Sequence, residues 1–258
     1  MLIDSHAHLD DPKFNKDRDR LIKSLKQNDI SLVINVGADV SSSIKSVKLA
    51  DEYENIYAAV GVHPHSAKEM DDSTIDVLKA FAKRDKVVAI GEIGLDFHYD
   101  NSPRDIQRKW FIEQIKLAKE LNMPIIVHSR DADQETFDIL KEEADERLRG
   151  VLHCYSGSAE MAKDYIDLGF YISLAGPVTF KNARKPKEVA KVVPMDKLLI
   201  ETDSPYLTPE PHRGKRNEPL YVRHVASMIA ELRGMDFEDV GRITSENTKR
   251  LFNIDYNL

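Results

Sequence analysis

Two histidines separated by a single residue, His6 and His8, directly follow an apolar segment at the start of the chain. This pattern is typical of a short strand, in which alternate side chains point to the same face. The two imidazoles would then lie about 7 Å apart by Cα, where both could bind one divalent metal ion. A lone His-x-His is equally compatible with two surface histidines at a strand end. The interpretation therefore depends on the rest of the chain.

Other histidines and carboxylates occur where further buried strands are predicted to end. They are His63, Glu92, His128, His153 and Asp203. In a (β/α)8 barrel the carboxyl ends of the strands meet on one face, and active sites of such barrels are built there. Independent structural side chains have no reason to gather at strand ends, and a buried unpaired charge is costly. The pattern predicts a metal site at the C-terminal rim of the strands.

The predicted ligand set is too large for one catalytic zinc ion, which typically uses three protein ligands. The chain offers two carboxylates and four imidazoles, namely Glu92, Asp203, His6, His8, His128 and His153. Two divalent metal ions about 3.5–4 Å apart would use all of them, with Glu92 as the bridging carboxylate. Imidazole suits zinc, nickel or manganese, so the donor types leave the identity of the metal open.

Eight short apolar segments alternate with amphipathic stretches along the chain. We predict strands at Met1–Ser5, Ser31–Val36, Tyr57–Val62, Lys86–Glu92, Pro124–His128, Gly150–His153, Phe170–Leu174 and Lys197–Thr202. Apolar strands that alternate with helices are typical of a parallel sheet covered on both faces. Eight such units favour an α/β fold of the (β/α)8 TIM-barrel type, with an open doubly wound sheet as the alternative.

Apolar residues at helical spacing predict the elements between the strands. One helix follows Ser102, its predicted N-cap, and Pro103, and its apolar stripe is Phe111, Ile115, Ala118 and Leu121. A second helix is predicted from about Leu220 to Leu232, and its apolar stripe is Val222, Val225, Ala226 and Ile229. A C-terminal helical stretch continues through Leu251.

The composition limits the classes of function. The 258 residues are 41% apolar and 31% charged with a net charge of −7, which argues against a protein that coats polyanions but allows a local basic site. No apolar run approaches the roughly 18–20 residues of a membrane span, and the N-terminus lacks a signal-peptide pattern. A single cysteine, Cys154, excludes an internal disulfide. We expect one domain over residues 1–258, a cytoplasmic location and no membrane partner.

Four separated motifs resemble, in the same order, those of one known family. They are SHAHLD at residues 5–10, GEIGLD at 91–96, HCYSG at 153–157 and ETDSPY at 201–206. Over essentially its whole length the chain is similar to the TatD family of metal-dependent deoxyribonucleases, which belongs to the amidohydrolase-like barrels. The resemblance implies a (β/α)8 barrel, hydrolysis of phosphodiester bonds in DNA, and magnesium or manganese as the metal. It also implies that His63 is a further active-site histidine and that the metal ligands are His6, His8, Glu92, His128, His153 and Asp203.

We predict catalytic roles for three residues of the site, Asp203, Glu92 and His63. A metal-bound water, with its pKa lowered toward about 7, would be the nucleophile. We expect Asp203 to orient that water and take its proton, and Glu92 to hold the two metals close together. We interpret His63 as a phosphate contact or a proton donor to the leaving group, with a structural role as the alternative. Glu201 shares the face of Asp203 and is expected to orient a metal ligand.

Positive charge for a DNA substrate is concentrated at a few positions. The run at residues 212–216 follows the eighth strand and contains Arg213 and Arg216, and Arg130 follows the fifth strand. Arginine suits bidentate phosphate contacts, so we predict these three as substrate-binding residues, with a solvated surface as the alternative. Small basic clusters favour an exonuclease that grips a single strand or a strand end. We expect a monomer, although the sequence leaves the oligomeric state open.

Two other functions are compatible with the same pattern. The barrel and its ligands support many chemistries, so hydrolysis of a small amide, lactone or phosphoester is the main alternative. A neutral substrate of that kind would not need the basic loops. The other alternative is a metal-stabilised binding protein without catalysis, and a complete ligand set with a candidate base argues against it. The choice between DNA and RNA and the strand polarity stay open.

Overall fold

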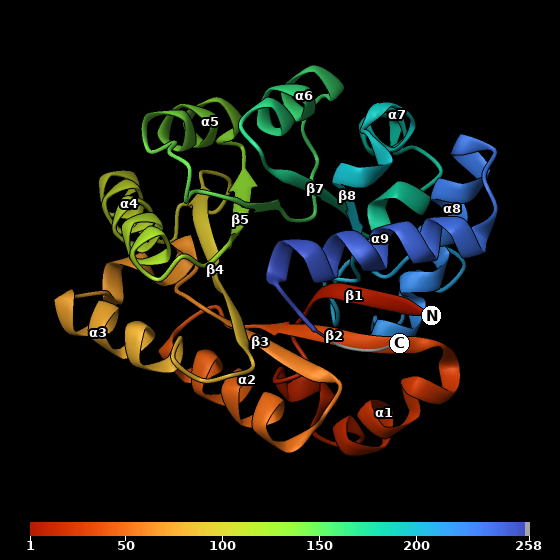
Figure 1. Ribbon diagram of the computed structural model, residues 1–258, viewed down its shortest axis with the longest axis horizontal. Helices are drawn as coiled ribbons and strands as arrows, with labels where there is room; N and C mark the ends of the chain where they lie inside the picture. The colour runs from red at the N-terminus through yellow and green to blue at the C-terminus, as the bar shows by residue number, and fades with distance from the viewer. Residues whose placement is uncertain (256–258) are drawn as a thin grey trace. The chain divides into compact units, whose positions relative to one another are not determined.

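The computed structural model describes residues 1–255 (Figure 1). Within them eight strands follow one another in the sheet order β1-β2-β3-β4-β5-β6-β7-β8, with helices between successive strands. The registers of β1–β2, β3–β4, β4–β5, β5–β6 and β7–β8 are parallel. An open doubly wound sheet would reverse its strand order at a switch point, which this order does not do. The predicted (β/α)8 fold class is confirmed.

The chain packs as two compact units. Unit 1 comprises Met1–Asn35, His153–Asp167 and the chain from Tyr171 onward, and unit 2 comprises Val36–Leu152 and Leu168–Phe170. The single domain expected over residues 1–258 stays a prediction. Among the described residues no helix combines the length and the apolar character needed to cross a membrane.

Unit 1 is built around the fully buried strand β1 (Leu2–Ala7). Its other strands are β2 (Ile30–Val36), whose last residue begins unit 2, β7 (Tyr171–Leu174) and β8 (Leu198–Ile200). Its α-helices are α1 (Arg18–Ser24), α6 (Ala159–Asp167), α7 (Arg184–Val192), α8 (Val222–Arg233) and α9 (Phe237–Phe252). Its 3-10 turns are η1 (Pro12–Phe14), η2 (Lys26–Asn28), η4 (Gly176–Thr179), η5 (Met195–Lys197) and η6 (Pro219–Tyr221).

Helices α8 and α9 bury the apolar faces that the sequence predicts. The stripe of α8 is buried throughout, as expected, at Val222, Val225, Ala226 and Ile229. Helix α9 packs on β1, and a Cβ added to Gly241 would lie 2.7 Å from Leu2 Cδ2. The absence of a side chain at Gly241 therefore lets this helix approach the strand that carries the first two histidines.

Unit 2 contains strands β3 (Ile56–Val60), β4 (Val87–Asp96), β5 (Ile125–Arg130) and β6 (Gly150–Leu152). Its helices are α2 (Val40–Glu52), η3 (Pro64–Glu69), α3 (Asp72–Phe81), α4 (Arg104–Glu120) and α5 (Asp133–Glu142). Helices α2 and α3 both begin with a capping box, in which the Asp39 and Asp71 carboxylates accept from backbone N–H groups of the first turn.

Two local predictions in unit 2 need correction. Strand β4 continues four residues beyond Glu92, because it stays paired with β5 as far as Asp96 and Arg130. Ser102 as the N-cap of α4 is wrong, since the cap residue is Pro103. The Ser102 hydroxyl instead donates to the carbonyl of His65 at 2.9 Å and accepts from the Lys68 N–H at 3.0 Å. This serine therefore fixes the turn that follows β3.

Candidate metal centres

The end of β1 and the turn after β8 bring together His6, His8 and Asp203 in unit 1. The Nε2 atoms of the two histidines are 3.2 Å apart, and Asp203 Oδ1 lies 3.4 Å from Nε2 of His8 and 3.9 Å from that of His6. We call these three residues cluster 1. Their donor atoms all lie within 4.8 Å of one another, and two imidazoles with a carboxylate are a donor set that divalent transition metals accept.

Backbone hydrogen bonds hold cluster 1 in place. The Asp203 N–H donates to the carbonyl of His6 at 2.9 Å, and the His8 N–H donates to the carbonyl of Ser204 at 2.7 Å. Burial acts to raise the pKa of the Asp203 carboxyl. The hydrogen bond from His8 and the charges of the neighbouring histidines outweigh burial, so the pKa lies below its ordinary value. Asp203 is therefore ionised at neutral pH.

A second group in unit 1 joins His6 to His153 and Glu201. The rings of His6 and His153 stack at 4.1 Å, and His153 Nδ1 lies 3.3 Å from Glu201 Oε1. The same carboxylate oxygen accepts the Cys154 N–H at 2.6 Å. The other oxygen, Oε2, is buried and has no hydrogen-bond partner among residues 1–255. Glu201 thus contacts the ring of His153, and its role in orienting a metal ligand stays a prediction.

In unit 2 the segment after β3 and the interiors of β4 and β5 bring together His63, Glu92 and His128, which we call cluster 2. Glu92 Oε1 lies 2.9 Å from His128 Nδ1 and 3.6 Å from His63 Nε2. The two imidazole rings meet edge to face at 4.4 Å. The donor atoms again lie within 4.8 Å of one another and suit a divalent cation. The bridging role predicted for Glu92 stays a prediction.

Two further residues of this group, His65 and Asp96, are missing from the predicted ligand set. Asp96 Oδ2 lies 2.9 Å from His65 Nε2 and 3.1 Å from His128 Nε2. Burial opposes ionisation, but the hydrogen bonds from His128 and the Tyr99 N–H hold the pKa of Asp96 well below its usual range. The signal that could have found both residues is spacing. His65 is two residues after His63, and Asp96 is four after Glu92 on the same face of a strand.

The three predicted substrate-binding arginines have different surroundings. Arg130 is exposed at the end of β5 with its guanidinium 4.8 Å from the ring centre of Tyr99. Arg213 is exposed in unit 1, with its guanidinium 3.9 Å from the ring centre of Phe180. Arg213 also donates to the carbonyl of Thr208 at 3.2 Å, and the contact of either arginine with a substrate stays a prediction.

Arg216 is instead occupied by contacts within the protein. Its two terminal nitrogens lie 2.6 and 2.8 Å from the carboxylate oxygens of Asp17, and one of them also donates to the carbonyl of Lys13 at 2.9 Å. Its guanidinium covers the buried ring of Phe14 at 4.4 Å. These contacts give Arg216 a structural role, and its contact with a substrate stays a prediction.

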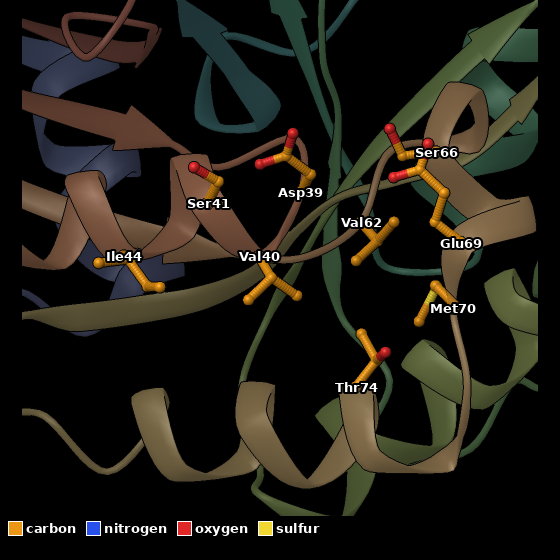
Figure 2. A pocket seen from close by; sticks show the side chains of 9 residues that line it. All are labelled: Asp39, Val40, Ser41, Ile44, Val62, Ser66, Glu69, Met70 and Thr74. Carbon is orange, nitrogen blue, oxygen red and sulfur yellow. The ribbon is translucent and has the colours of Figure 1, made fainter.

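A pocket of about 440 Å³ lies in unit 2, beside the residue that precedes His63 (Figure 2). Its wall combines the start of α2, the turn η3 and the start of α3, through Asp39, Val40, Ser41, Ile44, Val62, Ser66, Glu69, Met70 and Thr74. The apolar side chains and the two carboxylates make it unsuited to a phosphate group, because like charges repel. Neither the pocket nor its lining residues are part of the predicted site.

Comparison with known proteins agrees with the motifs. The family model described as TatD related DNase matches residues 3–253. A *Bacillus subtilis* protein named uncharacterized metal-dependent hydrolase YabD is 50% identical over 98% of this chain and 100% of its own. A *Citrobacter koseri* protein named 3'-5' ssDNA/RNA exonuclease TatD is 35% identical over 98% of this chain and 99% of its own. The crystal structure of the TatD homologue YjjV from *Escherichia coli* has a TM-score of 0.92 at 32% identity, with 98% of both chains covered. The chain therefore belongs to the TatD-related DNase family of metal-dependent hydrolases.

Proposed function

We propose that this protein is a metal-dependent deoxyribonuclease that hydrolyses phosphodiester bonds of single-stranded DNA or of strand ends, as an exonuclease. The observation that carries the proposal is the pair of clusters, each with two histidines and one carboxylate whose donor atoms lie within 4.8 Å. Such sets suit two divalent ions in all, one at cluster 1 and one at cluster 2. Family membership favours magnesium or manganese, while the imidazole donors also suit zinc or nickel.

The side chains around the clusters have distinct roles in the proposed reaction. A bound divalent ion would supply a water of lowered pKa and neutralise charge on the phosphoryl oxygens. Asp203 is ionised and accepts the proton of the attacking water, since it lies within the ligand group and keeps some exposure. We assign His63, 3.6 Å from Glu92, to a phosphate contact or to proton donation to the leaving oxygen, which leaves Glu92 and His128 as the metal ligands of cluster 2. Glu201 keeps the ring of His153 in position beside His6, where it is a further ligand for the ion of cluster 1.

Two exposed cations support a phosphate-containing substrate. Arg213 and Arg130 each lie over an aromatic ring, which limits the motion of the guanidinium, and Arg213 keeps a second terminal nitrogen for a phosphate beside the one that donates to the Thr208 carbonyl. The name of the *Citrobacter* relative supports a single-stranded substrate and adds RNA to the candidates. The cytoplasmic location and the monomeric state stay predictions.

The experiment that tests the proposal is a digestion of end-labelled strands at controlled metal content. Protein stripped with a chelator is titrated with magnesium, manganese, zinc or nickel. It is then incubated with single- and double-stranded DNA, RNA, and a panel of small amides, lactones and phosphoesters. We expect loss of labelled ends from single-stranded DNA, with activity restored by one or two ions per chain. Hydrolysis confined to the small substrates would refute the nuclease assignment and support the alternative hydrolase.

A further inference from the structure

A large exposed aromatic side chain, Tyr206, lies directly beside cluster 1. It follows Asp203 by three residues, and its ring centre lies 6.3 Å from that of His8. The side chain is 46% exposed, in a chain whose large apolar side chains are mostly buried. The proposed reaction assigns it no role.

The ring is fixed although it is exposed. Its hydroxyl donates to Asp11 Oδ2 at 2.9 Å, and the ammonium of Lys13 lies 4.5 Å from the ring centre. At its backbone, the Tyr206 N–H donates to the carbonyl of Asp203 at 2.9 Å, and its carbonyl accepts from the buried Asn217 amide at 2.6 Å. The aromatic plane is therefore held from both ends, and little side-chain entropy remains to be lost when a ligand packs on it.

The segment that holds the ring is itself tied down. Arg216 binds the carboxylate of Asp17 and the carbonyl of Lys13, on either side of the buried ring of Phe14. The Asp11 carboxylate accepts the N–H of Lys13 at 2.7 Å, which closes the start of η1. The partners of the Tyr206 side chain, Asp11 and Lys13, thus lie in a turn that is held by several hydrogen bonds.

From this arrangement we propose that Tyr206 is a stacking platform for a nucleobase of the strand whose phosphate is at cluster 1. The inference rests on the proposed nuclease function and names the residue that holds an unpaired base of its substrate. A base within a duplex is already stacked on its neighbours, whereas the free face of an unpaired base packs on an aromatic ring regardless of sequence. The Lys13 ammonium lies over one face of the ring and adds positive charge for the adjoining phosphate, so in this proposal the base packs on the opposite face. Tyr206 contacts the substrate in this proposal and takes no part in the proton transfers.

The test compares three variants on two strands of equal length and charge. One strand carries normal bases, and the other consists of tetrahydrofuran residues that lack bases. Tyr206→Ala removes the ring, Tyr206→Phe keeps the ring without the hydroxyl, and Leu207→Ala shortens the neighbouring exposed side chain as a matched control. Stacking on one ring typically changes affinity by about 5- to 140-fold. We expect Tyr206→Ala to raise KM for the normal strand by about that factor, with little change for the abasic strand or in the metal content. Tyr206→Phe should stay within about threefold of the wild type, because base stacking needs only the ring, and Leu207→Ala should match the wild type.

The outcomes separate this inference from the proposed function. An unchanged KM for the normal strand, or an equal loss on both strands, overturns the stacking role, because a base-independent effect cannot come from stacking. If the wild type hydrolyses neither strand, the nuclease proposal fails. In that case the stacking role is tested by binding alone. Fluorescence anisotropy gives the dissociation constants of the wild type and the variants for the normal and the abasic strand, and a loss confined to the normal strand in Tyr206→Ala supports the stacking.

Discussion

Replacement of Arg216 by alanine should destabilise the protein, although this arginine belongs to the basic run that resembles a substrate site. Both members of the pair with Asp17 are mostly shielded, with 26% and 20% of their side chains exposed. Hydrogen bonds to charged groups contribute about 1.5–3 kcal/mol, and a guanidinium over a ring adds about 0.5–1 kcal/mol. Because Asp17 regains water in the variant, we expect a net loss of about 2 kcal/mol in the free energy of unfolding.

The assay is urea unfolding of the wild type, Arg216→Ala, Asp17→Asn and the double variant. The interaction energy from this cycle isolates the pair, and Arg213→Ala serves as an exposed control expected to lose less than about 1 kcal/mol. A loss below about 0.5 kcal/mol for Arg216→Ala, or no interaction energy with Asp17, would refute the reasoning, because a solvated surface pair behaves in that way.

The stability that the Arg216–Asp17 pair contributes should decrease as the pH falls. The hydrogen bond from Arg216 is the main reason that the pKa of Asp17 lies below its ordinary value of 3.8. A carboxyl with a lowered pKa in the folded state contributes stability above its unfolded pKa and loses it as the pH falls through the folded one. The difference in stability between wild type and Arg216→Ala should therefore be full at pH 6 and shrink below about pH 4, as measured by unfolding at each pH.

The remaining predictions concern activity. Glu92→Gln should lower the rate on DNA at least about a hundredfold while the circular dichroism spectrum is retained, since it removes the charge of cluster 2; a near-wild-type rate would make Glu92 a purely structural carboxylate. Chelation should abolish hydrolysis, and elemental analysis should find one or two divalent ions per chain when activity returns; full activity in excess chelator would exclude the metal mechanism. Arg213→Ala should raise KM for oligonucleotides and reduce the salt slope by about 0.7 per lost phosphate contact, with little effect on a small chromogenic diester. Equal losses on both substrates would indicate damage at the metal ligands.

The eight strands could be predicted because each is a short apolar run, and such runs depend only on local sequence. The extent of β4 could not. Gly91 and Gly94 resemble turn residues, whereas in the structure they allow close packing of strands. A Cβ added to Gly94 would lie 1.9 Å from the carbonyl oxygen of His128, and its φ of +144° is unfavourable for other residues. The sequence shows a glycine, but the neighbouring strand decides whether that glycine ends a strand or permits its approach.

The candidate ligands were predictable for a similar reason, since histidines and carboxylates at strand ends stand out against an apolar background. His65 and Asp96 were missed because they follow the predicted ends of β3 and β4, so their two- and four-residue spacing from His63 and Glu92 was not taken as continuing the same face. The contact of Arg216 with Asp17 joins residues 199 positions apart, so no local pattern distinguishes a structural arginine from a substrate-binding one. In the basic run only the tertiary surroundings separate Arg213 from Arg216.

The ligands of cluster 1 come from distant parts of the sequence, and this affects when the cluster can form during synthesis. His6 and His8 are synthesised well before Asp203, which lies 195 positions after His8 in the chain. The three ligands of cluster 2 are all made by residue 128. A nascent or prematurely terminated chain that ends before residue 203 would hold the cluster 2 ligands but not the aspartate that completes cluster 1. Such a chain would lack Asp203, the base of the proposed reaction.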